Sequence, residues 1–361
     1  MLKPHLKKRP PLFVQNALRL GVIELAAHGA AHGVVNTYVE LVARNKRTAA
    51  MKGLTNAVLR KVAENANNWG KSPVPLMPNW LRRPLADAWG QKAISGIEKA
   101  HFQGAPLDLT PKSDAEADAK ATGGTILPTG SVRLQDSGQV SQLPGFEDGD
   151  WWVQDAAAAM PVKLLGDVSG LKALDLCAAP GGKTMQLAAG GAKVVAVDLS
   201  ESRLARVQEN LTRTKLSAQV MASDAFEISD GGFDVILLDA PCSATGTIRR
   251  HPDLPYAKDG AEFGMLIEQQ AALIDHALTL LSSGGRLVFC TCSLLPDEGE
   301  VQVEEALQRH PNLEVDQSAI ELDWVEEGWR TEEGGLRLRP DFWPELGGMD
   351  GFYMAVLRKP A

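Results

Sequence analysis

Residues 174–184, Leu-Asp-Leu-Cys-Ala-Ala-Pro-Gly-Gly-Lys-Thr, decide the fold of this chain. A short apolar segment ends here in small residues, and the pattern predicts that a helix begins directly after them. Small residues let a ligand approach the backbone closely, and the N-terminus of a helix favours negative charge. The glycine spacing is not the G-x-G-x-x-G of a dehydrogenase. A phosphate-binding loop is also disfavoured, because Cys177 occupies the position of that loop's first glycine.

Short apolar segments alternate with amphipathic helices on both sides of this stretch. The expected strands are Leu171–Leu176, Lys193–Asp198, Gln219–Asp224, Phe233–Asp239 and Arg286–Thr291. The expected helices are Lys183–Ala189, Ser202–Thr214 and Phe263–Leu281. Alternating units of this kind form a parallel sheet that is covered on both faces. Such sheets bind ligands outside the carboxyl ends of their strands, so we expect an α/β fold with its site at that edge.

Aspartates at the ends of these strands predict a nucleoside pocket. Asp198 can accept both hydrogen bonds of a ribose diol. Asp224, with Phe226 close behind it, suits an adenine amine and ring face. Asp239 ends the fourth strand, and with Asp175 in the first strand we expect four aspartates at successive strand ends. Each aspartate alone could instead cap a turn or a helix.

Two cysteines follow neighbouring strands, in Asp239-Ala-Pro-Cys242 and Thr291-Cys292-Ser293. Enzymes that methylate nitrogen place an aromatic residue where Cys242 stands, so a thiol there points to carbon as the methyl acceptor. C5 of cytosine is a weak nucleophile until a thiolate adds to C6, and this chemistry requires a cysteine. Asp239 could then stabilise the adduct near N3. The alternative is that both thiols are simply buried and apolar.

The remaining cysteines indicate packing rather than a metal or a disulfide. We expect Cys290 to point to the face of its strand opposite Cys292, and Cys177 to line the cofactor loop. Four cysteines in the second half of the chain do not form a disulfide framework. The Cys290-x-Cys292 spacing is too short for a common zinc knuckle, and no histidine lies beside it. No metal is expected.

Charge is distributed unevenly along the chain, whose net charge is −8. Residues 1–71 hold 12 Lys and Arg against three Glu, whereas the rest holds 25 against 42 Asp and Glu. The basic segment suggests a module that binds a polyanion, although a solvated helical surface would look the same. The sequence has neither an apolar run long enough for a membrane nor a secretion signal, so we expect a cytoplasmic protein.

The sequence divides into three regions, of which the α/β part is the last. Residues 12–66 have helical periodicity, with a third helix at Lys52–Ala63, and Trp69–Pro75 is predicted to be a linker. Residues 79–145 are expected to begin with a helix that contains Trp80 and Trp89, followed by a strand at 106–111. A second helix is expected to begin at a Ser113/Glu116 capping box and to end at Gly123-Gly124. Residues 126–134 are expected to form a further strand. The predicted domains are residues 1–72, 73–145 and 146–361.

The motifs at 174–184, 239–243 and 291–293 together resemble the RNA 5-methylcytosine methyltransferases of the NOP2/NSUN/RsmB group. The resemblance covers most of residues 145–361, and Asp350–Ala355 is similar to the family's closing strand. Arg19–Leu25 and Asn56–Arg60 resemble the later helices of a NusB-like RNA-binding domain. That combination is characteristic of the bacterial RsmB branch, which methylates 16S rRNA at cytosine 967. The first NusB-like helices have no counterpart, so we expect a truncated domain.

The resemblance implies a class I S-adenosylmethionine-dependent methyltransferase fold, with a Rossmann-like, mostly parallel seven-stranded sheet after an all-α domain and a small α/β domain. It implies that Cys292 is the nucleophile and that Cys242 assists product release. The residues expected to hold S-adenosylmethionine are Cys177, Ala178, Ala179, Pro180, Gly181, Gly182, Lys183, Asp198, Asp224 and Asp239. The residues expected to contact RNA are Arg44, Lys46, Arg47, Arg249, Arg250 and His251. We expect a monomer that acts on 16S rRNA, free or in early assembly particles.

Two other functions remain open at this point. A tRNA 5-methylcytosine methyltransferase would share every catalytic residue, and only the N-terminal helices argue against it. A non-catalytic RNA-binding or antitermination factor could retain the fold, but it would not need thiols at both strand ends.

Overall fold

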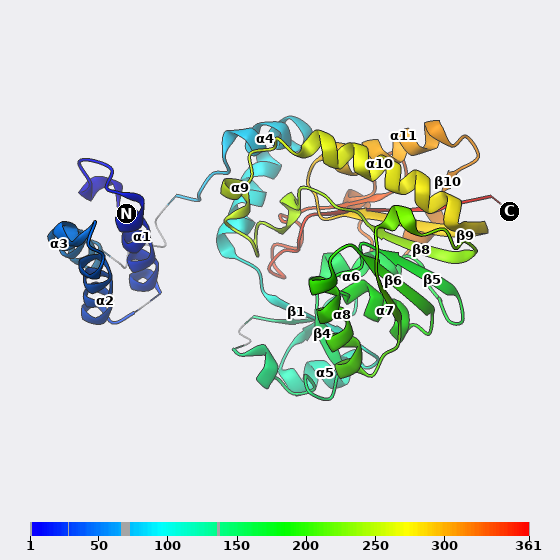
Figure 1. Cartoon of the computed structure of the whole chain (residues 1–361), viewed down its shortest axis with the longest axis horizontal. Helices are drawn as coiled ribbons and strands as arrows, with labels where there is room; N and C mark the ends of the chain where they lie inside the picture. The colour runs from blue at the N-terminus through cyan, green and yellow to red at the C-terminus, as the bar shows by residue number, and fades with distance from the viewer. Residues whose placement is uncertain (1, 28, 66–72, 136–137, 361) are drawn as a thin grey trace. The chain divides into compact units, whose positions relative to one another are not determined.

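The computed structural model divides into two compact units, Met1–Val74 and Pro75–Ala361. It describes residues 2–27, 29–65, 73–135 and 138–360. Most of the expected linker at 69–75 lies outside the described residues. Figure 1 shows the helical N-terminal unit in blue and the α/β unit in cyan to red. No helix in the described ranges is long and apolar enough to cross a membrane.

The N-terminal unit packs three helices around one apolar core. They are α1 (Leu12–Ala26), α2 (Ala31–Arg44) and α3 (Lys52–Ala63), with short 3-10 turns at Lys3–His5 and Ala49–Met51. Apolar residues three and four positions apart form one face of each helix, so Leu18, Val42 and Leu59 are all fully buried. The helical periodicity of the sequence is thereby confirmed.

The second unit begins with α4 (Asn79–Gln103), which is broken at Gly90, where φ is +79°. A small sheet follows, with strand order β2-β3-β1-β4. Its elements are β1 (Leu107–Pro111), α5 (Ala115–Thr122), β2 (Thr125–Ile126), β3 (Val132–Leu134) and β4 (Trp151–Val153). β4 pairs with β1, so the sheet extends past residue 145. The division into three domains remains a prediction.

Two local expectations for this small sheet are wrong. The N-cap of α5 is Asp114 rather than Ser113, because the Asp114 carboxylate accepts the backbone N–H of Ala117 at 2.9 Å. The extended segment expected at 126–134 is a hairpin of β2 and β3, which pair antiparallel. The turn at Gly130, where φ is +81°, reverses the chain between them. Gly123 ends α5 in the left-handed conformation, as expected.

The large sheet has the strand order β10-β12-β9-β8-β5-β6-β7, with β11 beside β12. Its strands are β5 (Lys172–Leu176), β6 (Lys193–Asp198), β7 (Gln219–Ala222), β8 (Phe233–Asp239), β9 (Leu281–Thr291), β10 (Glu314–Val315), β11 (Leu336–Leu338) and β12 (Phe352–Arg358). The strands β5 to β9 pair with one another in parallel, whereas β12 pairs antiparallel with β9, β10 and β11. The expected Rossmann-like α/β fold is confirmed, with eight strands when β11 is included.

Helices cover both faces of this sheet (Figure 1). They are α6 (Ala156–Lys163), α7 (Gly182–Ala189), α8 (Glu201–Thr214), α10 (Phe263–Leu280) and α11 (Glu300–Arg309). The short helix α9 (Leu254–Ala257) instead lies beside α4, where the Trp80 indole donates to the carbonyl of Pro255 at 3.0 Å. α6 and α7 contribute to one apolar core with Val235 and Val288 of the sheet. α10 and α11 contribute to the other core, with Ile236 and Leu287. Adjacent residues of a strand therefore enter different cores, as the pleat requires.

Asp175 lies inside β5, and the expectation that it belongs to the strand-end pocket is wrong. Its side chain is fully buried, and its Oδ2 accepts a hydrogen bond from the hydroxyl of Thr184 at 2.5 Å. Asp175 is the residue before the last in β5, and its side chain points to the face of the sheet that α7 covers. It does not point beyond the ends of the strands. Burial raises the pKa of the Asp175 carboxyl to about 7.

We predict that Asp175→Asn changes the pH dependence of stability. The folded-state pKa of about 7 exceeds the ordinary 3.8, so the folded protein holds a proton that the unfolded chain has released. Wild-type stability therefore falls as the pH rises through this window, and the uncharged amide escapes that loss. Relative to wild type, the variant's free energy of unfolding should gain about 2 kcal/mol between about pH 5.5 and pH 8 in urea titrations. An equal difference at both pH values would contradict the prediction.

Candidate active site

Two hollows open at the carboxyl ends of the parallel strands. The first, of about 400 Å³, is lined by Cys177, Asp198, Asp224 and Phe226, among others. The second, of about 580 Å³, is lined by residues of the 178–183 loop and by several polar side chains. Those polar residues include Asp239, Arg250, His251 and Cys292. Arg203 lines both hollows, so they adjoin each other.

The loop at 177–182 separates these hollows, and small residues are needed where it packs closely. Gly181 has φ of +98°, and a Cβ there would lie 2.9 Å from Val207. A Cβ on Gly182 would lie 3.1 Å from Gln154. The chain then enters α7 directly at Gly182. Position 181 therefore requires glycine, because of its positive φ and because of the close contact with Val207. The absence of side chains at 181 and 182 lets a ligand approach the backbone of the loop.

Asp198 organises the loop from the end of β6. Its carboxylate accepts the backbone N–H groups of Ala179 at 3.0 Å and Ser200 at 2.9 Å, and it lies 3.6 Å from the Arg203 guanidinium. Arg203 in turn donates to the carbonyl of Ala179. The capping role considered for this aspartate is therefore real, yet Asp198 also lines the first hollow, and a carboxylate oxygen can accept more than one hydrogen bond.

Asp224 and Phe226 form the exposed wall of the first hollow. Asp224 caps the 3-10 turn Ala225–Glu227 by accepting the Phe226 N–H at 3.0 Å. The Phe226 ring is 43% exposed, which leaves an apolar face open to a planar group. Acidic acceptors, an exposed ring and a loop of small residues fit a nucleoside.

Lys183 and Asp239 form a largely buried ion pair in the second hollow. The Lys183 ammonium donates to Asp239 Oδ2 at 2.8 Å, and its side chain is only 9% exposed. It also lies 4.9 Å from the centre of the Phe352 ring. Burial alone would lower the pKa of Lys183, but the Asp239 carboxylate outweighs it and raises that pKa above its ordinary range. Lys183 therefore remains a cation next to the thiols.

Cys242 and Cys292 meet as expected, with their sulfur atoms 3.5 Å apart. Both follow neighbouring strands, and the backbone carbonyl of Cys292 accepts the N–H of Gly246 at 2.9 Å. The hydrogen bond with Cys292 and burial raise the pKa of the Cys242 thiol well above its usual range. Burial raises the pKa of Cys177 to about 12, consistent with a residue that lines the cofactor loop without reacting.

The expected orientation of Cys290 is wrong. Residues two positions apart in a strand share a face, so Cys290 points the same way as Cys292 rather than opposite to it. Its sulfur lies 3.6 Å from Asp239 Oδ1. Cys290 is fully buried, and burial raises its pKa well above the ordinary value, so it stays a neutral thiol.

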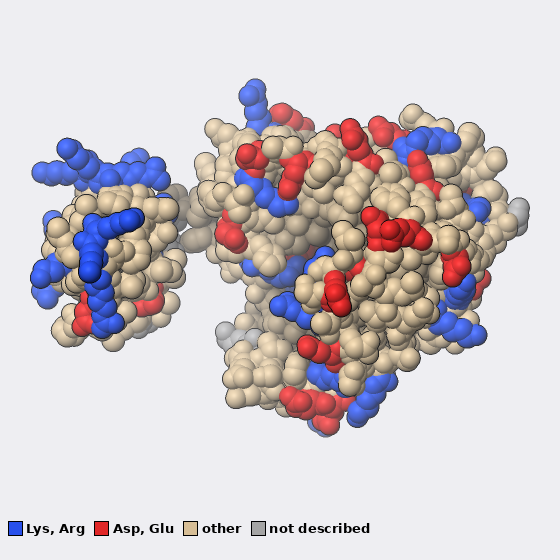
Figure 2. Space-filling view, in the orientation of Figure 1, with Lys and Arg blue, Asp and Glu red and all other residues tan. Residues whose placement is uncertain are grey.

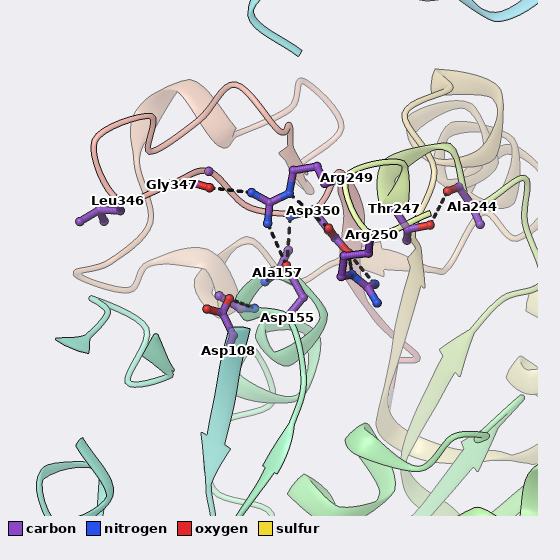
Figure 3. Close-up of polar contacts among 12 residues, drawn as sticks. Asp108, Asp155, Ala157, Ala244, Thr247, Arg249, Arg250, Leu346, Gly347 and Asp350 are labelled. Carbon is purple, nitrogen blue, oxygen red and sulfur yellow. Dashed lines mark hydrogen bonds and ion pairs between the residues drawn. The ribbon is translucent and has the colours of Figure 1, made fainter. Parts of the chain in front are cut away.

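The structure also corrects the expectation that Arg249 contacts RNA. Its side chain is fully buried, 3.2 Å from Asp155 and 3.5 Å from Asp350, and it donates to the carbonyl of Gly347 at 2.7 Å. Figure 3 shows Arg249 reaching between these two carboxylates. Arg250 pairs with Asp350 at 2.6 Å but remains 42% exposed. Sequence reasoning missed Asp155 and Asp350, because their partners lie about 94 to 195 residues away along the chain.

The other residues expected to contact RNA are exposed. His251 lies at the second hollow. Arg44, Lys46 and Arg47 lie on the N-terminal unit, where Arg44 pairs with Glu40 at 3.1 Å in full contact with solvent. In Figure 2, most of the charged side chains on the visible face of this unit are Lys and Arg. In the described residues, no group of three His, Cys, Asp or Glu side chains is placed to hold a metal.

Solved structures share the fold of this chain. A methyltransferase homologue from Pyrococcus horikoshii superposes with a TM-score of 0.61 at 25% identity, over 77% of this chain and 93% of its own. NSun6 from the same organism, solved with the ligand SFG, gives a TM-score of 0.67 at 19% identity, over 79% and 98%. At the latter identity the likeness concerns the fold alone.

Sequence comparisons identify the family. The family model "16S rRNA methyltransferase RsmB/F" matches residues 163–358, and the NusB family model matches residues 1–64. The ribosomal RNA small subunit methyltransferase B of Erwinia tasmaniensis is 37% identical, over 91% of this chain and 78% of the relative. That of Serratia proteamaculans is 38% identical over the same shares. The chain therefore belongs to the RsmB/F family of methyltransferases and carries a NusB-family segment at its N-terminal end.

Proposed function

We propose that this protein methylates C5 of a cytosine in 16S rRNA, with S-adenosylmethionine as methyl donor and Cys292 as nucleophile. The observation that carries the proposal is the pair of thiols 3.5 Å apart beside the Lys183–Asp239 ion pair. Methylation of nitrogen or oxygen requires no such pair. The relatives' names supply the RNA, and cytosine 967 is the proposed target.

The first hollow, together with the part of the second hollow that adjoins it along the 177–183 loop, is the proposed place for the cofactor. The loop of Cys177, Ala178, Ala179, Pro180, Gly181, Gly182 and Lys183 would hold it, together with Asp198, Asp224 and Asp239. Bound there, S-adenosylmethionine supplies an electrophilic methyl group. The small side chains of the loop permit close approach, and Phe226 offers an apolar face to the adenine.

Cys292 is the proposed nucleophile because it lines the second hollow, which Cys242 does not. Its thiolate forms a bond to C6 of the cytosine, and the electron pair of the C5–C6 double bond moves into the ring toward N3. The Lys183–Asp239 pair can supply a proton or a hydrogen bond at N3, where that charge develops. C5 then has the electron density of an enamine and can accept the methyl group. Loss of the C5 proton finally lets the S–C6 bond break.

Cys242 is proposed to assist that last step. Its raised pKa keeps it a neutral thiol near pH 7, in contact with the sulfur of Cys292. A neutral thiol can give a proton to the departing Cys292 sulfur or relay the proton from C5.

Both units are proposed to contact the RNA. Arg250 and His251 would contact the target nucleotide at the second hollow, and Arg44, Lys46 and Arg47 of the N-terminal unit would contact phosphates. The substrate is proposed to be 16S rRNA, free or in early assembly particles, and the protein to act as a monomer in the bacterial cytoplasm.

We expect Cys292→Ala to lower the methylation rate by at least about a thousandfold, because C5 cannot be activated without addition at C6. Calorimetric affinity for S-adenosylmethionine should stay within about threefold of wild type. The measurement uses tritium transfer to unmodified 16S rRNA. Retention of full activity would disprove the nucleophile assignment.

Cys242→Ala should accumulate a covalent complex between protein and RNA, because adduct formation survives while release is slowed. The complex should be visible as a shifted band on denaturing gels after incubation with both substrates. The double variant Cys242→Ala/Cys292→Ala is the matched control and should form no adduct. Without a band in the single variant, the release role fails.

The substrate is tested by mapping 5-methylcytosine in cells that lack the gene. Bisulfite sequencing should show the loss of one methylated cytosine in 16S rRNA, expected at position 967, with tRNA unchanged. Wild-type protein should restore it, and Cys292→Ala should not. Loss of methylation in tRNA instead would establish the tRNA alternative.

A further inference from the structure

A fully buried carboxylate, that of Glu298, lies between the two loops that carry the cysteines. Glu298 ends the 3-10 turn Pro296–Glu298, just before α11. Its Oε1 accepts the backbone N–H of Ser243 at 2.9 Å, and its Oε2 accepts the hydroxyls of Ser243 at 2.5 Å and Ser293 at 2.6 Å. One carboxylate therefore binds two segments of chain that are 50 residues apart.

The two serines are the residues that directly follow the two cysteines. Ser243 follows Cys242, and Ser293 follows Cys292. Their hydroxyls also contact each other at 3.1 Å. Because each serine that Glu298 binds is the residue next to a cysteine, a movement of Glu298 would be passed directly to the thiols.

Two further contacts hold Glu298 itself. The amide of Gln270, on α10, donates to Glu298 Oε1 at 3.1 Å and to the carbonyl of Pro241 at 2.8 Å. The Thr291 hydroxyl donates to the backbone carbonyl of Glu298 at 2.7 Å. The end of β9, α10 and the Cys242 loop are thereby joined at one buried point.

No Lys or Arg pairs with Glu298 in the part of the chain that the structure describes, where its partners are neutral donors. A buried carboxylate without a counter-ion is costly unless hydrogen bonds replace its water. An apolar residue at this position would leave the Ser243 N–H and the Gln270 amide without this acceptor. We therefore explain the carboxylate by the groups that it binds, which lie on the two loops that carry the cysteines.

We propose that Glu298 is a positioning residue for the methyl transfer, which sets the separation of the Cys242 and Cys292 sulfurs by holding Ser243 and Ser293. The inference rests on the proposed function, since it takes Cys292 as nucleophile and Cys242 as its partner. Glu298 touches neither substrate nor cofactor in this account. Its negative charge also disfavours ionisation of Cys242 and so contributes to the raised pKa of that thiol.

The test compares Glu298→Ala and Glu298→Gln with a matched control. Glu98→Ala is the control, because Glu98 is also a buried carboxylate of the same unit, 2% exposed. It accepts the Met77 N–H at 2.9 Å and pairs with Arg82 at 2.9 Å. Thermal unfolding ranks the stability of all three variants, and assays are run well below the lowest melting temperature. The readouts are kcat, KM for 16S rRNA, calorimetric affinity for S-adenosylmethionine, and the rate of adduct formation with target RNA containing 5-fluorocytosine.

Glu298→Ala should lower kcat and the adduct rate by on the order of a hundredfold, the usual effect of a displaced reacting group. KM and cofactor affinity should stay within about threefold. Glu298→Gln should recover most of the rate, because the amide has the same shape and the serine hydroxyls can rotate to accept from it. Glu98→Ala should destabilise the protein yet retain its kcat.

The inference is overturned if Glu298→Ala keeps the kcat of Glu98→Ala, or if its loss appears only in KM or cofactor affinity. Equal defects in Glu298→Gln and Glu298→Ala at equal stability would also overturn it, since shape and hydrogen bonding would then not matter. Should Glu298→Ala fail to fold, the Gln variant still decides through its kcat and adduct rate. The proposed function fails separately, if Cys292→Ala remains active in the same assay.

Discussion

The parallel pairing of β8 with β9 is the constraint on which the site depends. In this pairing Asp239 lies opposite Cys290, so the two strands end at the same level of the sheet. The chain that leaves β8 carries Cys242, and the chain that leaves β9 carries Cys292. Because parallel neighbours end at one edge, two thiols 50 residues apart come within 3.5 Å without a covalent link. A shift of this register would separate the thiols and also move Asp239 away from Lys183.

Buried ion pairs connect the chain around the second hollow to the small sheet. Arg133 pairs with Asp108 at 2.6 Å, with both side chains almost fully buried, and donates to the carbonyl of Gly348 at 2.7 Å. The first turn of α6 lies next to it, where Asp155 accepts hydrogen bonds from Arg249 and from the Asp350 N–H. Removing one partner of such a pair leaves an unpaired buried charge, which is strongly destabilising. The small sheet, α6 and the chain before β12 are thus coupled beside the second hollow.

Local patterns predicted the elements of this fold well, and long-range contacts account for the errors. The bounds of β6 and β8 follow from apolar runs that each end in an aspartate, and small residues mark the loop before α7. The thiol pair was predictable because strand order brings known strand ends together. Arg249 could not be assigned from sequence, since its burial depends on carboxylates that are distant in the chain. Glu298 gave no sequence signal either, because its hydrogen bonds cross between loops. The error about Cys290 is of another kind, because the two-residue period of a strand is enough to place Cys290 on the same face as Cys292.

The surroundings of Cys242 also hold its thiol in the protonated form. Two thiolates 3.5 Å apart would repel strongly in a partly buried site, so the pair loses one proton before the other. Lys183, which its pairing with Asp239 keeps charged, lines the second hollow together with Arg250 and Cys292. The negative charge of Glu298 acts on Cys242 and favours the thiol form. The raised pKa of Cys242 therefore agrees with the proposed roles, in which the sulfur that lines the second hollow is the nucleophile and its neighbour keeps the proton for the release step.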